Sequence, residues 1–171
     1  MPDNSPSQSH RDQAPQSVGV AVITVSDTRT LLDDLGGALI VQLLELAGHR
    51  VMARSIIIDQ QERITEAVEA MLADPQVDAV LLTGGTGLAA RDQTTEAVQR
   101  LFDAEVPGYG ELFRMLSYQE IGPAAMLSRA VAGRVGRKLV LTMPGSPNGV
   151  RLAMDKLIVP ELAHLVLHAG K

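Results

Sequence analysis

Residues 77–97 read VDAVLLTGGTGLAARDQTTEA and contain the pattern that decides the fold: a strand, a glycine-rich turn and the start of a helix. The short apolar run Val80–Leu82 is typical of a strand that is covered on both faces. The glycines of Gly84–Gly87 permit positive φ angles and a close approach of the backbone to a ligand. Thr94 or Thr95 is expected to cap the helix. Such a turn holds anions well, so we predict that it binds a phosphate.

Strands and helices alternate on both sides of this turn, which indicates βαβ units. We therefore predict an α/β fold: one three-layer domain with a mostly parallel sheet and helices on both faces. The other predicted strands are Val18–Val25, Val51–Ile58 and Lys138–Met143, and the predicted helices are Ala38–Ala47, Glu62–Leu72, Thr95–Phe102 and Val150–His168. Between Pro107 and Gly133 we expect a short helix over Glu111–Tyr118 and then the segments Pro123–Leu127 and Ser128–Ala132. Pro160 is expected to kink or break the last helix.

Composition narrows the class of protein. The 171 residues are 46% hydrophobic but only 2% aromatic, so aliphatic side chains must build the core. The net charge of -5 argues against nucleic-acid and anionic-membrane partners, which favour a basic face. The absence of cysteine excludes disulfides and thiolate chemistry. No signal peptide and no 18-residue apolar run is present, so we expect a soluble, cytoplasmic protein.

The first 17 residues differ from the rest of the chain. They contain no Val, Ile, Leu, Phe, Tyr or Trp and are rich in Pro, Ser and Gln, so they bury too little apolar surface to offset the entropy of ordering. We predict a disordered tail over residues 1–17 and a folded domain over residues 18–171.

Polar side chains follow the ends of several predicted strands. Ser26 and Asp27 come after the first strand, Asp59 after the second, and Arg91 and Asp92 after the glycine turn. Open α/β sheets bind ligands at the carboxyl ends of their strands, which makes these residues site candidates. Each carboxylate could equally be a cap or a solvated loop charge, and Arg91 could merely offset Asp92.

Other patterns carry less weight. Gly85-x-Gly87-x-x-Ala90 fits a loose dinucleotide fingerprint, but it follows the third strand instead of the first, and no Gly-Lys-Ser/Thr P-loop is present. His164 and His168 have a metal-binding spacing without a third ligand, and cations are favourable near a helix C-terminus in any case. The four aromatic residues lie between Phe102 and Tyr118, where they indicate core packing or, as a second choice, a subunit interface.

Short motifs follow one another in order from Val18 to the C-terminus. They are Thr83–Gly87, Arg91-Asp92 with Thr94, Glu96 and Ala97, Pro107-Gly108, Glu111–Arg114, Ile121-Gly122, Ser128–Ala130 with Gly133, and Pro144–Pro147. Together they resemble the molybdenum-cofactor biosynthesis family MogA/MoaB, and the short C-terminus and Phe113–Ser117 are most similar to MoaB members. One departure stands out: the family's Asp-x-Ser/Thr-Gly before the first helix reads Asp34-Leu35-Gly36-Gly37 here, without the hydroxyl.

The resemblance implies a molybdopterin-binding domain and a Mg²⁺-dependent reaction. In that reaction the terminal phosphate of molybdopterin attacks the α-phosphorus of ATP and gives adenylyl-molybdopterin and pyrophosphate. The resemblance makes Asp59 and Asp92 the catalytic residues, and we expect them to act as Mg²⁺ ligands. We assign molybdopterin-phosphate contacts to Thr83, Gly84, Gly85, Thr86, Gly87, Ser117 and Ser128, and nucleotide-binding or supporting contacts to Ser26, Asp27, Arg91, Pro144, Gly145 and Ser146.

The resemblance also implies a homo-oligomer, a trimer or a hexamer, and other cofactor-biosynthesis proteins as partners. Two alternatives to the adenylyltransferase remain open at this point. One is a non-catalytic molybdopterin-binding or regulatory paralogue in the same pathway, and the other is a Rossmann-type oxidoreductase that uses NAD(P).

Overall fold

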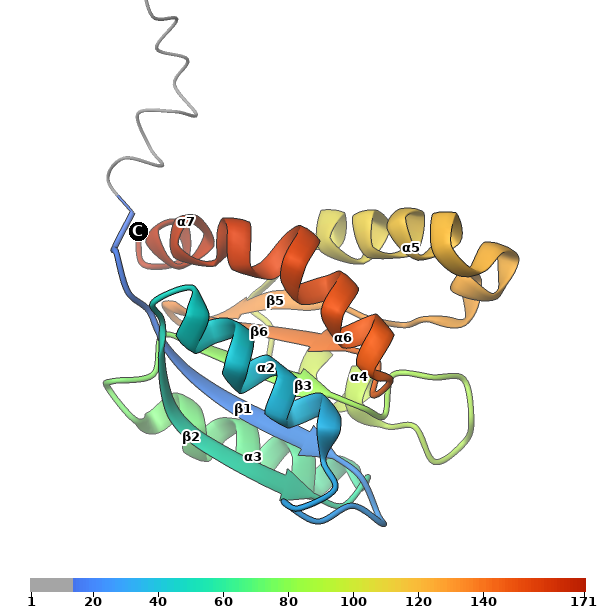
Figure 1. Ribbon diagram of the computed structural model, residues 1–171. Coiled ribbons are helices and arrows are strands. Elements are labelled where there is room, and N and C mark those ends of the chain that lie inside the picture. Colours follow the sequence, from blue (N-terminus) through green and yellow to red (C-terminus); the bar gives the residue numbers. More distant parts are fainter. Residues whose placement is uncertain (1–13) are drawn as a thin grey trace, which may run out of the picture.

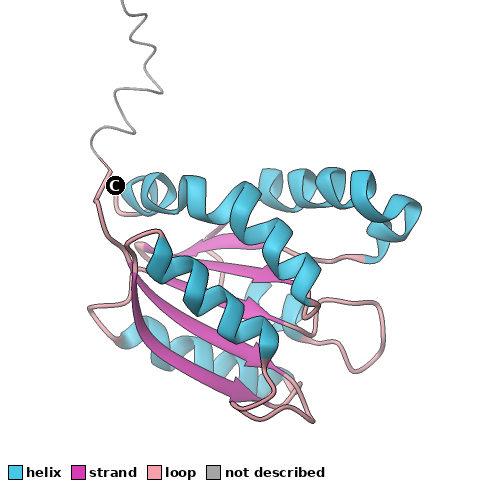
Figure 2. Cartoon of the chain, in the orientation of Figure 1, coloured by secondary structure: helices cyan, strands magenta, loops and turns pink. Residues whose placement is uncertain are grey.

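The apolar runs form the inner strands of one sheet in the computed structural model, which describes residues 14–171. Two layers of helices cover this sheet (Figures 1 and 2). The described strands are β1 (Gly19–Val25), β2 (Arg50–Ile57), β3 (Ala79–Thr83), β4 (Ala104–Glu105), β5 (Ala132–Val135) and β6 (Lys138–Met143), in the spatial order β2-β1-β3-β6-β5-β4. The described helices are α2 (Leu35–Leu46), α3 (Gln61–Ala73), α4 (Thr94–Gln99), α5 (Pro107–Ile121), the 3₁₀ helix η1 (Gly122–Leu127), α6 (Pro147–Ala153), the π-helix η2 (Met154–Ile158) and α7 (Val159–Ala169).

The sheet is mostly parallel, as predicted. Strands β2, β1, β3 and β6 run in one direction, and β5 and β4 form an antiparallel edge. Val22 of β1 pairs with Leu81 of β3, which pairs in turn with Leu141 of β6. These side chains are buried because the inner parallel strands are covered on both faces.

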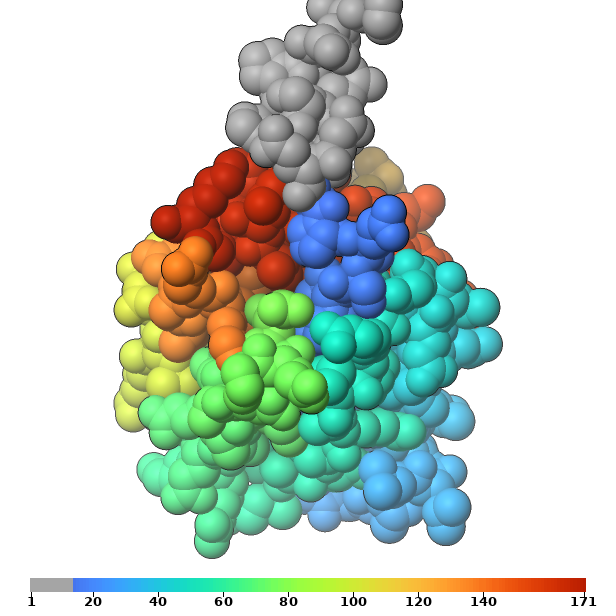
Figure 3. Space-filling model, turned by 90° about the vertical axis from the view of Figure 1, so that its left-hand side faces the viewer, coloured from blue at the N-terminus to red at the C-terminus, as the bar shows by residue number. Residues whose placement is uncertain are grey.

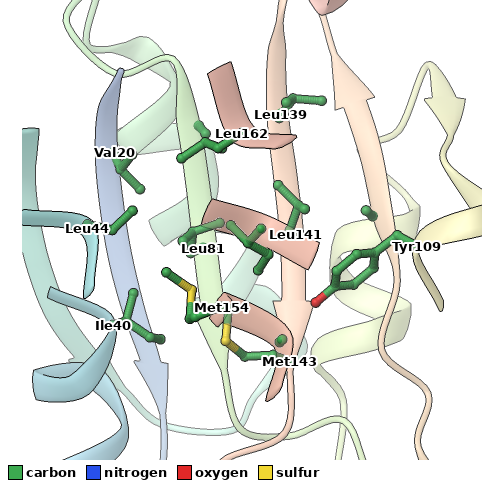
Figure 4. Packing of buried hydrophobic residues seen from close by; sticks show 14 of the residues in the cluster. Val20, Ile40, Leu44, Leu81, Tyr109, Leu139, Leu141, Met143, Met154 and Leu162 are labelled. Carbon is green, nitrogen blue, oxygen red and sulfur yellow. The ribbon is translucent and has the colours of Figure 1, made fainter. Parts of the chain in front are cut away.

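Alternation along the strands divides the core into two clusters. Val20 and Val22 pack with α2, α5, α6, η2 and α7 on one face, whereas Ala21 and Ile23 pack with α3 and α4 on the other. Figure 4 shows the first cluster, in which strand residues meet helix residues: Val20, Leu81, Leu139, Leu141 and Met143 against Ile40, Leu44, Tyr109, Met154 and Leu162. The predicted three layers with helices on both faces are therefore confirmed.

The two helices after the central strand, α4 and α5, differ from the prediction. Helix α4 begins after Gln93, so Thr94 and Thr95 lie inside the helix and neither is its cap. Helix α5 is longer than the predicted Glu111–Tyr118. Its first turn begins at Pro107, a residue that suits this position, and it includes Gly110, which lies against another segment. A Cβ atom on Gly110 would lie 2.7 Å from the carbonyl oxygen of Ala130, so glycine is required there by packing.

The short antiparallel edge was not predicted. Strands β4 and β5 are two and four residues long, too short for a periodic pattern to reveal. Of the expected segments, Pro123–Leu127 forms the 3₁₀ helix η1, and Ser128–Ala132 is extended chain that leads into β5.

The C-terminal helix accommodates Pro160 without a break. The predicted break at Pro160 does not occur, and one turn of π-helix, Met154–Ile158, comes directly before α7. The N–H of Val159 bonds to the carbonyl oxygen of Met154, an i→i−5 pairing. A π-turn is a known way to absorb an irregularity within a helix.

The two ends of the described chain lie side by side. Val18 is fully buried in the same cluster as Ala169 of α7, and Figures 1 and 3 show the first described residues (blue) next to α7 (red). The predicted disordered tail lies outside the described residues, except for residues 14–17, which form no helix or strand. Within residues 14–171 no helix is both long enough and apolar enough to cross a membrane.

Candidate functional site

The site lies where the four parallel strands end. The loops after β1, β2, β3 and β6 share this edge of the sheet, at the arrowheads in Figure 1. Strand β1 continues into α2 on one face, whereas its neighbour β3 continues into α4 on the other. The two loops therefore diverge between β1 and β3, and such a switch point is where open α/β sheets place their ligands.

Two glycine-containing turns pack against each other at this edge. A Cβ atom on Gly84 would lie 2.3 Å from the carbonyl oxygen of Val25, and one on Gly145 would lie 3.3 Å from the Cα of Gly84. The hydroxyl of Thr83 donates to the carbonyl oxygen of Pro144 (2.9 Å), which joins the turn after β3 to the turn after β6. Thr83 is thus buried and bonded to the protein, and the exposed surface of the turn is backbone.

An acidic cavity of about 160 Å³ opens beside the turn after β3. Its lining comes from three loops and consists of Val25, Ser26, Asp27, Asp59, Gly85, Arg91 and Asp92. Five of the predicted site residues other than the glycines therefore meet in one cavity, although they are up to 66 positions apart (92 − 26) in the sequence.

Asp59 bonds to both of the other loops that line this cavity. Its backbone N–H donates to Oδ1 of Asp27 (2.9 Å), and its own Oδ1 accepts from the backbone N–H of Gln93 (3.0 Å). Burial raises the pKa of Asp59, and the nearby carboxylates of Asp92 and Asp27 raise it further, while the Gln93 N–H and Arg91 act in the opposite direction. Carboxylates held together in this way favour a cation between them.

Asp92 lies in a tight turn of its own. Its Oδ2 accepts from the backbone N–H of Ala89 (2.9 Å), and a Cβ atom on Gly87 would lie 2.6 Å from the same oxygen. Gly87 therefore leaves the space that the Asp92 carboxylate occupies.

The donor set suits Mg²⁺, which prefers carboxylate oxygens. Within residues 14–171 no three His, Cys, Asp or Glu side chains are placed to hold a metal ion among themselves. Mg²⁺ is commonly held by one or two carboxylates together with substrate phosphates, and Asp59 and Asp92 fit that mode.

A second cavity, of about 140 Å³, lies between α5, η1 and the turn after β6. Its polar lining is Ser117, Glu120, Ser128, Ser146 and Asn148, and its apolar wall includes Phe113, Ile121, Ala125, Pro144 and Leu152. The structure thus places Pro144 and Ser146 beside the two serines predicted to bind the pterin phosphate, and none of these residues lines the acidic cavity. Gly145 belongs to the turn after β6 and packs against Gly84 of the turn after β3.

Several predicted contacts are engaged within the protein. Ser26 Oγ accepts from the backbone N–H of Arg29 (3.2 Å), and Thr86 is buried with its carbonyl oxygen bonded to the N–H of Arg129 (3.0 Å). His164 pairs with Glu161 (3.0 Å), and its ring lies edge-on to His168 at a centroid distance of 4.7 Å. The histidine pair lies on α7 and lines neither cavity.

Gln93 and Arg129 contribute to the site without having been predicted. The backbone N–H of Gln93 bonds to Asp59, and its side-chain oxygen accepts from the N–H of Gln61 (2.9 Å). Arg129 contacts the loop that carries Asp92. A backbone N–H contact leaves no trace in residue type, and Arg129 belonged to a quoted motif that gave no indication of its partners.

The dinucleotide fingerprint does not have the required geometry. In that motif the glycines open a helix whose N-terminus holds the pyrophosphate. Here α4 begins only at Thr94, and the turn around Ala89–Asp92 lies between the glycines and the helix.

Three of the four aromatic residues pack in the core. Tyr109 and Phe113 are buried, Phe102 is partly buried against the second cluster, and Tyr118 is exposed. The expected core packing is therefore confirmed for Tyr109 and Phe113, whose burial leaves them no surface for a subunit interface.

Comparisons with known proteins show the family to which the chain belongs. Residues 21–164 match the family described as "Probable molybdopterin binding domain". The Molybdenum cofactor biosynthesis protein B of Bacillus subtilis (strain 168) is 52% identical over 165 residues, which cover 96% of this chain and 97% of that protein. A crystal structure of a Molybdenum cofactor biosynthesis protein B is 52% identical with a TM-score of 0.89, covering 92% of this chain and 98% of the other. The tungsten cofactor synthesizing protein MoaB from Pyrococcus furiosus is 34% identical with a TM-score of 0.79, covering 92% and 100%. The chain therefore belongs to the MoaB family of molybdenum cofactor biosynthesis proteins.

Proposed function

We propose that this protein transfers AMP from ATP to the terminal phosphate of molybdopterin, in a Mg²⁺-dependent reaction that releases pyrophosphate. The observation that carries the proposal is the convergence of Asp59 and Asp92 on one cavity, beside a second cavity that three serines line. The acidic cavity would take the triphosphate with its metal ion, and the serine cavity would take the pterin phosphate.

The chemistry requires positioning more than acid–base catalysis. An oxygen of the molybdopterin phosphate forms a bond to the α-phosphorus of ATP, while the bond from that phosphorus to the bridging oxygen breaks and pyrophosphate leaves. The nucleophile is already an anion, so no strong general base is needed. The main obstacle is repulsion between two anions, about 4 kcal/mol at 4 Å with an effective dielectric constant near 20.

The residues of the site address that repulsion. Backbone N–H groups of the turn after β3 and the guanidinium of Arg91 supply positive charge. Asp59 and Asp92 would hold Mg²⁺, which when bound neutralises charge on the phosphates. The N–H of Gln93 holds the Asp59 carboxylate, and the missing side chain of Gly87 leaves room for the Asp92 carboxylate.

The direct test is pyrophosphate release from ATP that depends on added molybdopterin and on Mg²⁺. Asp92→Ala should lower the rate by about 10²–10³, as for the loss of one electrostatic stabiliser. Glu45→Ala, which removes an exposed carboxylate of α2, is the matched control and should leave the rate unchanged. Molybdopterin binding without any ATP-dependent product would instead identify a non-catalytic paralogue.

We further propose that the protein works as a homo-oligomer, assembled through one face of α5 and η1. Six large apolar residues are exposed there: Leu112, Met115, Tyr118, Ile121, Met126 and Leu127. The four on α5 are spaced by three positions, which places neighbouring members on one side of a helix. Exposed apolar side chains gathered on two successive helices are typical of an interface.

A further inference from the structure

The loop between β3 and α4 carries Asp92 but contains no helix or strand over residues 84–93. Its internal hydrogen bonds join only Ala89 and Asp92: the Asp92 N–H donates to the Ala89 carbonyl, and the Ala89 N–H donates to the Asp92 carboxylate (2.9 Å each). A turn closed on itself in this way can still move relative to the sheet. The two ends of the loop are held separately, by the bond of the Gln93 N–H to Asp59 (3.0 Å) and by the bond of the Thr94 N–H to the Gly85 carbonyl oxygen (3.1 Å). The stretch from Gly87 to Asp92 between these bonds depends on a further attachment to fix the Asp92 carboxylate beside Asp59.

Arg129 supplies that attachment from a distant part of the chain. Its Nε donates to the carbonyl oxygen of Gly87 and its Nη2 to that of Asp92, both at 2.7 Å. Its Nη1 pairs with the carboxylate of Glu96 on α4. Its backbone adds two bonds, from its N–H to the Thr86 carbonyl (3.0 Å) and from the Thr95 hydroxyl to its own carbonyl (2.9 Å).

Only an arginine can make these three side-chain contacts at once. The guanidinium holds five N–H donors in a rigid plane, whereas a lysine presents one nitrogen on a flexible stem. The side chain of Arg129 is 26% exposed, so its bonds to the two carbonyl oxygens are partly shielded from water. The Arg129 bond also lowers the pKa of Glu96, although burial acts to raise it, which keeps the ion pair charged.

We infer that Arg129 is a positioning residue, which fixes the loop so that the Asp92 carboxylate faces Asp59. Arg129 does not line the acidic cavity, so it acts through Asp92. It directly follows Ser128 of the second cavity, so the same short segment contacts both parts of the site. A small displacement of a catalytic group can cost about 10²-fold in rate, which makes this attachment important for activity.

The first test measures the loop itself and needs no substrate. In Arg129→Gln the backbone amides of Ala89 and Asp92 should exchange with solvent at least about tenfold faster, because two charged hydrogen bonds to the loop are lost. Arg134→Gln is the matched control: Arg134 also bonds a carbonyl, that of Gly136, but it lies on β5 and lines neither cavity. Unchanged exchange in a folded Arg129→Gln protein would overturn the inference. If that variant does not fold, Arg129→Lys is measured in the same way, with the same expected direction.

The second test rests on the proposed function. Arg129→Gln should lower kcat by about tenfold to a hundredfold, with the KM for molybdopterin unchanged. Added to Asp92→Ala, it should cause no further loss, because the group that it positions is already gone. Losses that multiply in the double variant would contradict a role through Asp92. If the wild-type protein releases no pyrophosphate, the proposed function fails, and amide exchange alone decides the role of Arg129.

Discussion

Single glycine residues shape the site largely by leaving space for neighbouring side chains. Gly85 has φ = +65°, and a Cβ atom there would lie 2.2 Å from the Thr94 hydroxyl and 2.7 Å from the Asp59 carboxylate. Gly85→Ala should therefore lower the free energy of unfolding by about 1–3 kcal/mol and displace Asp59. Chemical denaturation and pyrophosphate release measure the two effects.

Gly108→Ala provides the comparison for this substitution. Gly108 lies in the first turn of α5, and nothing lies within 4 Å of a Cβ atom built there. Alanine is favoured over glycine in a helix by about 1 kcal/mol, so this variant should be as stable as the wild type or more stable. Equal effects of the two substitutions would show that Gly85 is not conformationally required.

Asp34 links α2 to the sheet and should make stability depend on pH. Its buried carboxylate accepts from Arg54 of β2 (2.8 Å), from the Thr24 hydroxyl (2.8 Å) and from the N–H of Gly37 (2.9 Å). Burial acts to raise the pKa of Asp34, but the bonds from Arg54, Gly37 and Thr24 together bring it below the ordinary value of 3.8. The stabilisation is therefore complete above pH 3.8 and is lost as the pH falls through the lower pKa of the folded state.

Asp34→Asn tests this dependence. At neutral pH the variant should be about 1.5–3 kcal/mol less stable than the wild type, because charged hydrogen bonds are lost. The difference should shrink as the pH falls below 3.8, because the carboxyl of the unfolded wild type takes up a proton there, and it should be smallest below the lower pKa of the folded state, where the carboxyl is neutral in both states. Urea denaturation across this range gives the values. Asp155→Asn removes an exposed partner of Arg151 (3.8 Å) and should have little effect at any pH.

Two adjacent glycines of α2 should respond in opposite ways to the same change. A Cβ atom on Gly36 would make only ordinary contacts, the nearest at 3.4 Å from the Gly145 carbonyl oxygen. A Cβ atom on Gly37 would lie 2.2 Å from the Asp34 carboxylate that caps the helix. Gly36→Ala should raise stability by about 0.4–1 kcal/mol, whereas Gly37→Ala should lower it by at least the roughly 0.5–2 kcal/mol of a lost cap. Thermal unfolding of both variants decides this, and a stabilised Gly37→Ala would refute the capping role of Asp34.

The sequence predicted those elements whose pattern is local. The inner strands are continuous apolar runs, so β1, β3 and β6 were expected within about one residue of their observed bounds. The edge formed by β4 and β5 depends on a distant pairing, such as Glu105 with Gly133, which leaves no periodic signal. The length of α5 was not predicted because Gly108 and Gly110 weaken the helical pattern of the sequence. Glycine is needed at position 110 because it packs against Ala130.

The sequence could predict which residues meet at the site better than it could predict the contacts among them. Ser26, Asp27, Asp59, Arg91 and Asp92 all follow strands, and a parallel sheet brings such positions to one edge, so their meeting in one cavity follows from topology. The separation into two cavities does not follow, because it depends on how α5 and η1 pack over the turn after β6. The side-chain bonds of Arg129 to two carbonyl oxygens were equally inaccessible, since any residue can offer a carbonyl.

At the scale of the whole molecule, α5 has two different faces. Phe113 and Ser117 are buried against the subunit, whereas Met115 and Tyr118 on the other side are 51% and 60% exposed. Ile121, Ser117 and the residues of η1 also line the serine cavity, so a subunit docked on this face would cover its rim. Assembly and molybdopterin binding should therefore be linked.

The linkage gives a prediction for the assembled protein. Leu112→Glu combined with Met115→Glu places two charges on the exposed face and touches neither cavity lining. We expect light scattering to give a multiple of the chain mass for the wild type and a single chain for this variant, because burying unpaired carboxylates is unfavourable. Leu46→Glu changes a leucine at the end of α2 that is more exposed than Leu112 or Met115, and it should leave the assembly intact. The monomeric variant should also bind molybdopterin more weakly, since the rim of the serine cavity is uncovered. A wild-type monomer would refute the oligomer, and a monomeric variant with unchanged molybdopterin affinity would show that each subunit carries a complete pocket.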